Sequence, residues 1–242
     1  MHYIVLDFEW NQPLSEKEML MEPFPFDSEI IEIGAIKLDE SFQTVDEFKT
    51  FIRPQFYPHL SNAVVQLTKI RPQELEKAPS FSEAFDAFID WCGDDCALCS
   101  WGPDDIPVLL DNMLLHGIPT EPFPYCYDLQ RIFARELLRE NRQCSLSDAV
   151  KMLKLPADRA HDALNDTRNT VRVCERMDLA GCIDEYRTAF VGYGADRKSG
   201  LISGLIYPSL DAALADTRVK EITCPYCGEQ VSLTVSPQEG NT

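Results

Sequence analysis

The sequence is short of positive charge. Its 242 residues include 22 lysines and arginines against 40 aspartates and glutamates, a formal net charge of -18 at pH 7. Because affinity for a phosphate backbone depends on lysine and arginine, this balance argues against a protein that coats nucleic acid. It does not exclude an enzyme that holds the end of a strand through metal ions.

Long hydrophobic runs are also absent. No segment approaches the roughly 20 apolar residues of a membrane-spanning helix, and the first residues lack the basic-then-apolar pattern of a secretory signal. The nine cysteines are an odd number spread through expected helices and strands, which is typical of small buried side chains in an intracellular protein. We therefore expect a soluble, cytoplasmic protein without a membrane partner.

The apolar residues that are present make up 45% of the chain and predict strands first, then alternating helices and strands. Strands are expected over 3–8, 29–39 and 47–54, and their short links favour an antiparallel meander. The alternating patterns that follow predict further elements over 80–92, 96–101, 104–117, 125–138, 145–155 and 161–177. This order indicates an α/β fold, a mixed sheet with antiparallel and then parallel strands covered by helices.

The composition changes after about residue 190, where glycine, small and turn residues become frequent. We expect a main domain over 1–185 and a small C-terminal extension over 186–242. The extension carries Cys224 and Cys227 in a CPYCG turn that is typical of a zinc knuckle. Structural zinc takes four ligands, so this is half of a site, and a plain hairpin is the alternative.

Acidic residues stand where buried strands end. Asp7 and Glu9 follow the apolar part of the first strand, and residues two apart on a strand share a face. Like charges at this spacing repel unless a cation holds them. Taken alone, an Asp-x-Glu pair is also typical of a solvated strand end.

A second acidic position follows the strand at 96–101. Asp104 and Asp105 open the next helix, where the free N–H groups and the helix dipole favour an aspartate cap. Val108 and Leu109 follow Asp105 by three and four residues and would pack inward from the same helical face. We expect Asp105 to face the sheet and Asp104 to be the cap, with the choice of ligand between them open.

The third position is the segment AHDALNDTRNT at 160–170. His161 and Asp166 lie five residues apart, in a helix or in a loop that leads into one, with Asp162 as a rival carboxylate and candidate cap. Four carboxylates and an imidazole favour Mg²⁺ or Mn²⁺ over zinc. Two such ions would lie about 3.5–4 Å apart and hold the attacking and leaving oxygens of a phosphoryl displacement.

The ordered set of Asp7-x-Glu9, Asp105, and His161 with Asp166 resembles the DEDDh family of 3′→5′ exonucleases, which have a ribonuclease-H-like fold. The resemblance covers roughly residues 1–180 and includes EIIEIGAIKLD, LTKI, APSFSEAFDAFIDW and SWGPDD. Within the family the chain is similar to the branch that trims structured RNA ends and to its bacterial relatives of the sporulation-inhibitor type.

The resemblance implies a role for each of these residues. Asp7 would bridge two metal ions, Glu9 and Asp166 would complete one metal site, and Asp105 would hold the second ion. His161 would be the general base that takes a proton from the attacking water. The product released from the 3′ end would be a nucleoside 5′-monophosphate.

Candidate substrate contacts surround this set. Trp10 would stack on a terminal base or, alternatively, cover the edge of the core, and Asn11 would bond a ribose or a base. Phe8 is also a candidate substrate contact, although it points away from the acidic pair, as core residues do. The resemblance places Leu67 and Thr68 in a region that lines the last nucleotide.

The expected function is therefore metal-dependent 3′→5′ hydrolysis of single-stranded nucleic acid ends, with RNA favoured. One alternative is a DNA proofreading or repair exonuclease. Another is an inactive relative that serves as a binding or regulatory module. All five expected side chains are present, so the sequence gives no support for inactivity.

Overall fold

The computed structural model describes residues 1–22, 25–120, 124–140 and 142–186. The expected C-terminal extension, with Cys224 and Cys227, lies outside the described residues from 187 onward. Among the residues described, no helix combines the length and apolar character that crossing a membrane requires.

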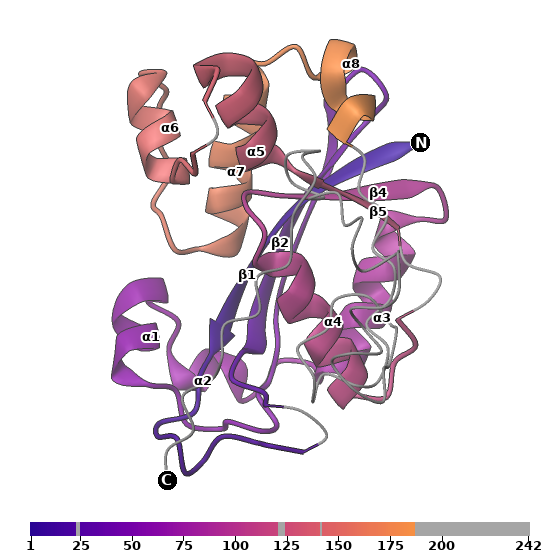
Figure 1. Cartoon of the computed structure of the whole chain (residues 1–242). Coiled ribbons are helices and arrows are strands. Elements are labelled where there is room, and N and C mark those ends of the chain that lie inside the picture. Colours follow the sequence, from indigo (N-terminus) through magenta and orange to yellow (C-terminus); the bar gives the residue numbers. More distant parts are fainter. Residues whose placement is uncertain (23–24, 121–123, 141, 187–242) are drawn as a thin grey trace, which may run out of the picture. The chain divides into compact units, whose positions relative to one another are not determined.

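Five strands form one mixed sheet in the order β3-β2-β1-β4-β5 (Figure 1). The first three, β1 (His2–Asn11), β2 (Glu29–Leu38) and β3 (Thr44–Phe51), are antiparallel. The last two, β4 (Cys96–Ser100) and β5 (Tyr125–Asp128), are parallel to β1. The predicted antiparallel meander followed by parallel strands is confirmed.

The helices follow the strands in the expected places, with short additions that the sequence patterns did not reveal. They are α1 (Asn62–Thr68), α2 (Pro72–Leu75), α3 (Phe81–Cys92), α4 (Asp105–Leu115), α5 (Leu129–Ile132), α6 (Leu146–Met152), α7 (Ala163–Cys174) and α8 (Leu179–Cys182). A π-helical stretch, η1 (Phe133–Leu138), continues α5, and a 3-10 turn, η2 (Ile183–Tyr186), follows α8.

The sheet is covered on both faces. Figure 1 shows α7 on one side of β1 and β2 and the α3–α4 pair on the other. Val5 of β1 belongs to the cluster that contains Leu164 and Val171 of α7. Because alternate residues of a strand share a face, Asp7 and Glu9 lie on the α7 side, beyond the apolar part of the same row.

β1 extends past its neighbour. Its parallel pairing with β4 runs only from His2 to Val5, whereas its antiparallel pairing with β2 continues to Asn11. The second half of β1 therefore has one edge without a strand partner. Polar groups that follow β4 can reach this edge.

Gly34 of β2 brings α7 unusually close to the sheet. A Cβ atom at this position would lie 2.2 Å from the Ala163 carbonyl carbon and 2.2 Å from the Leu164 nitrogen, so the absence of a side chain permits the contact. The Thr167 hydroxyl also donates to the Gly34 carbonyl oxygen, at 3.2 Å. Gly34 stands opposite Asp7 in the sheet, so the first turn of α7 lies beside the acidic end of β1.

Candidate active site

The end of β1 contributes two carboxylates. Glu9 is 8% exposed and Asp7 is partly exposed. A shift in the β1–β2 register follows between Glu9 and Trp10. Irregularities of this kind are frequent beside active sites because they change the direction of side chains.

α4 contributes the third carboxylate. Asp105 is buried, and its Oδ1 accepts a hydrogen bond of 3.2 Å from the backbone N–H of Phe8, which lies in the unpaired edge of β1. Asp105 therefore faces the sheet, as the helical spacing predicts. Asp104 occupies the N-cap position, as predicted, but its side chain makes no capping hydrogen bond.

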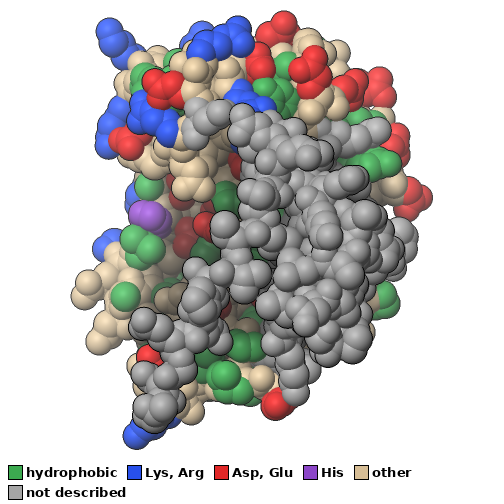
Figure 2. All heavy atoms as spheres, in the orientation of Figure 1, with side chains coloured by type: hydrophobic (Ala, Val, Ile, Leu, Met, Phe, Trp, Pro, Cys, Tyr) green, Lys and Arg blue, Asp and Glu red, His purple; other side chains and the backbone are tan. Residues whose placement is uncertain are grey.

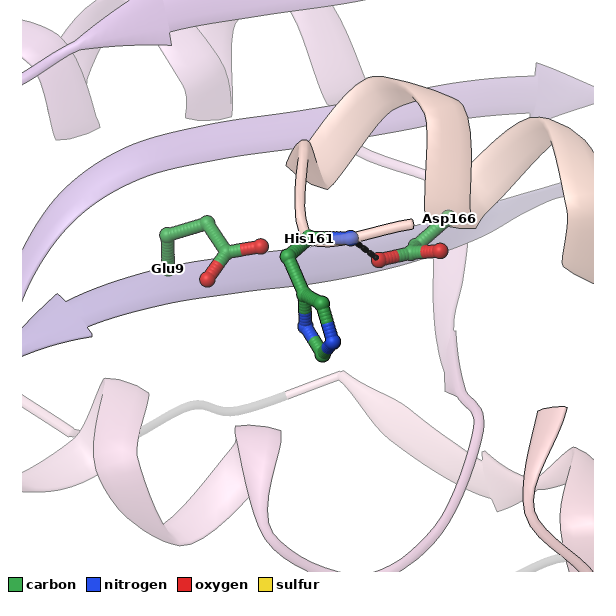
Figure 3. A group of neighbouring side chains, drawn as sticks. All are labelled: Glu9, His161 and Asp166. Carbon is green, nitrogen blue, oxygen red and sulfur yellow. Dashed lines mark hydrogen bonds between the residues drawn. The ribbon is translucent and has the colours of Figure 1, made fainter. Parts of the chain in front are cut away.

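The segment before α7 contributes the imidazole and the fourth carboxylate. His161 precedes the helix, is exposed, and has a left-handed backbone with φ of 62°, which is uncommon for a residue with a side chain. Its N–H donates to Asp166 Oδ2 at 2.7 Å. Asp162 caps α7 by accepting a hydrogen bond from the Asn165 N–H at 3.2 Å. The imidazole extends away from α7 (Figure 3).

These separate segments meet. Metal-ligating atoms of Glu9, His161 and Asp166 all lie within 4.8 Å of one another, and Figure 3 shows the Glu9 carboxylate directed from β1 toward the His161 segment. On the face seen in Figure 2, acidic side chains lie recessed beside a histidine. A group of carboxylates beside an imidazole, open to solvent on one side, can hold cations and accept a proton.

Burial raises the pKa of all four carboxyl groups. The pKa of Asp7 lies far above its usual range because of burial and then the charges of Asp105 and Asp166. Burial and the nearby Glu32 raise the pKa of Glu9 to about 8, and burial raises that of Asp105 to about 7. Burial also raises the pKa of Asp166, although the N–H bond from His161 opposes it. Ionising the cluster therefore requires positive charge, and a donor set of carboxylate oxygens fits Mg²⁺ or Mn²⁺.

Stability without divalent cations should fall as the pH rises from 5 to 8. In the unfolded chain these carboxyl groups ionise near pH 4, whereas Glu9 and Asp105 keep their protons in the folded protein up to about pH 8 and 7. The folded state thus binds more protons over this range and loses stability as they dissociate. Urea unfolding in chelator at several pH values measures this. A midpoint that is constant or rises from pH 5 to 8 would contradict the assignment.

Three of the predicted substrate contacts are buried in the fold. The Asn11 side chain is fully buried and donates to the Tyr57 and His59 carbonyl oxygens, at 2.8 and 3.1 Å. The Thr68 hydroxyl is buried and hydrogen-bonds to backbone groups at the end of α1. Phe8 is buried in the core. The fold therefore gives these three side chains internal contacts, and their predicted contacts with substrate stay predictions.

The other two predicted contacts are accessible. Trp10 is partly exposed where β1 ends, and Leu67 of α1 is 51% exposed. Both stay predictions, because accessibility alone does not assign them a ligand.

Two charged residues of the site escaped the sequence patterns. Glu32 is buried and stands opposite Glu9 in the sheet. Lys49 of β3 forms ion pairs with two carboxylates, with its Nζ 2.6 Å from Glu32 Oε1 and 2.8 Å from Asp162 Oδ2. The available signal for Glu32 was the single carboxylate inside the otherwise apolar run IIEIGAI at 30–36, since an isolated charge in a buried strand needs a partner.

Comparisons with known proteins identify a family of exonucleases. The RNase T model, described as an exonuclease, matches residues 4–174. The DNA polymerase III PolC-type of Thermotoga maritima is 32% identical over 176 residues, covering 72% of this chain and 12% of that protein. Human 3′-5′ exoribonuclease 1 is 25% identical over 171 residues, covering 66% of this chain and 49% of that protein. The chain thus spans less than half the length of either relative.

Solved structures share the fold. The nuclease domain of 3′hExo, a DEDDh family member solved with rAMP bound, superposes with a TM-score of 0.63 and 25% identity. The match covers 75% of this chain and 93% of that domain. The ribonuclease-H-like architecture expected from the sequence is confirmed.

Proposed function

Since this chain belongs to the RNase T family of exonucleases, we propose that it is a metal-dependent 3′→5′ exonuclease acting on single-stranded nucleic acid, with RNA favoured over DNA. The observation that supports this most directly is the meeting of Glu9, His161 and Asp166 from distant parts of the chain. Asp105 joins them through its bond to the backbone beside Asp7 and Glu9.

In this proposal the four carboxylates would hold two Mg²⁺ or Mn²⁺ ions. Asp7 would serve both ions, Glu9 and Asp166 would serve one of them, and Asp105 would serve the other. When bound, the ions lower the pKa of water and neutralise charge that develops on the phosphate.

His161 would act on the water. Its exposed imidazole, extended into the site from the loop before α7, takes a proton as the water oxygen bonds to the terminal phosphorus. The bond from that phosphorus to the 3′ oxygen of the preceding nucleotide breaks. The leaving 3′ oxygen takes up a proton from solvent, so the products are a nucleoside 5′-monophosphate and a chain one nucleotide shorter with a free 3′ hydroxyl.

The preference for RNA is supported by the human exoribonuclease relative and by the rAMP in the 3′hExo domain. A DNA substrate is the second candidate, because the Thermotoga relative is a DNA polymerase. A cytoplasmic location remains part of the proposal.

The test uses the whole chain and 5′-labelled RNA and DNA strands of the same sequence, with Mg²⁺, Mn²⁺ or chelator. We expect stepwise shortening from the 3′ end in either metal, none in chelator, and a higher initial rate on RNA. Faster DNA cleavage would favour the polymerase-like alternative. Strands that stay intact in both metals would leave only a binding or regulatory role.

A further inference from the structure

Lys49 bridges two acidic residues that flank the candidate active site. Its ammonium group lies 2.6 Å from a carboxylate oxygen of Glu32 on β2 and 2.8 Å from one of Asp162, the residue after His161. The Glu32 side chain is 1% exposed and that of Asp162 is 18% exposed. Ion pairs this shielded from water are stronger than pairs on an open surface, and removing one partner leaves the other charge without compensation.

The Lys49 bridge holds the two residues that follow His161. Asp162 caps α7 through the Asn165 N–H, and Glu32 Oε2 accepts a hydrogen bond of 3.4 Å from the Ala163 N–H. His161 itself has the left-handed backbone described above. A strained conformation of this kind persists only where its surroundings hold it, and the next two residues are held by Lys49 and Glu32.

A second cation contacts the same oxygen of Asp162. Arg159 Nη2 lies 3.5 Å from Asp162 Oδ2 and donates to the Thr68 carbonyl oxygen at 3.3 Å. The Arg159 side chain is more exposed than that of Lys49, and among the described residues Arg159 forms its ion pair with Asp162 and not with Glu32. Lys49 is thus the cation that joins the buried carboxylate opposite Glu9 to the cap of α7.

We propose that Lys49 is a positioning residue, which forms ion pairs with Glu32 and Asp162 together and so fixes the turn that presents His161 to the substrate. The inference rests on the proposed exonuclease function for its kinetic consequence. Its structural consequence, the placement of the His161 ring, does not depend on that function.

The test compares three variants of the full chain. Lys49→Met removes the charge and keeps much of the side-chain length, whereas Lys49→Arg keeps the charge. Arg168→Met is the matched control, because the Arg168–Glu47 ion pair also joins α7 to β3 but does not include Glu32 or Asp162. We expect Lys49→Met to lower kcat about 10- to 100-fold, since small displacements of a reacting group have effects of this size. KM should change less than kcat, Lys49→Arg should recover most of the rate, and Arg168→Met should resemble the wild type.

The second readout is the NMR signal of the His161 ring, identified by its loss in His161→Gln. The chain has four histidines, so the spectrum is simple. The His161 signal should shift in Lys49→Met and stay in place in Arg168→Met. An unmoved signal, or a kcat loss no larger than that of Arg168→Met, would overturn the proposal. If the wild type itself has no nuclease activity, the proposed function fails, and the NMR comparison alone decides whether Lys49 positions the ring.

Discussion

An Asp7→Asn variant will lose nuclease activity to background while keeping its fold. Asp7 is the carboxylate whose pKa is raised by burial and by Asp105, Asp166 and Glu9, so it is the group that the other charges of the site surround. Asparagine has nearly the same shape but no charge. It therefore leaves the packing of β1 intact and removes the negative charge that would attract divalent ions.

The same variant should be more stable than the wild type in chelator at pH 8. Ionised Asp7 is disfavoured in the folded protein, so the wild type loses stability as the pH rises and this group ionises in the unfolded chain. The amide of Asp7→Asn does not ionise, so the variant does not lose stability in this way. Thermal unfolding of both proteins, measured with and without Mn²⁺, tests the stability in chelator and the stabilisation by the ion. The wild type should gain more from the ion than Asp7→Asn does.

Asp104→Asn is the matched control, because Asp104 is exposed and adjacent to Asp105 on the same helix start. It should keep activity near the wild-type level, while Asp105→Asn should lose it. The reverse order would show that Asp104 is the ligand. Full activity in Asp7→Asn would remove the carboxylate cluster from the mechanism altogether.

A His161→Gln variant should lower kcat by about 10²–10⁴-fold, the usual contribution of a general base. Its effect on binding should be small, because the imidazole is exposed and the bond to Asp166 comes from the backbone N–H. That bond survives the substitution, so Asp166 keeps its orientation. Single-turnover cleavage separates the chemical step from the affinity for a labelled RNA strand.

His59→Gln is the control for this substitution, since His59 is also exposed and its recorded contact to Asn11 uses only its carbonyl oxygen. It should cleave at the wild-type rate. A His161→Gln enzyme that retains the wild-type rate would exclude the imidazole as the base. A loss confined to RNA affinity would assign His161 to substrate binding.

The parts of the site that could be predicted from sequence depend on local periodicity. The two-residue spacing of Asp7 and Glu9 puts them on one face of a strand, and the helical spacing from Asp105 to Val108 and Leu109 turns the carboxylate inward. Both rules act within a few residues. They hold here because the apolar residues nearby are buried against the same sheet.

The parts that could not be predicted depend on contacts between distant segments. The Asn11 amide is occupied by carbonyl groups of Tyr57 and His59, 46 and 48 residues away. Lys49 and Asp162 are separated by 113 residues. No spacing rule within one element reveals such pairs, and the left-handed backbone of His161 likewise follows from how its neighbours are held.

The close packing at Gly34 has a consequence for how this site can vary. The four carboxylates come from β1, α4 and α7, and Asp166 and His161 are carried by α7 and the turn before it. The contact of Gly34 with the backbone of Ala163 and Leu164 sets the distance from these two side chains to Asp7, although it takes no part in the chemistry. A larger residue at position 34 would require the start of α7, which lies between His161 and Asp166, to move away from β2. The width of the site is thus an adjustable property of the scaffold, separate from the identity of its reactive groups.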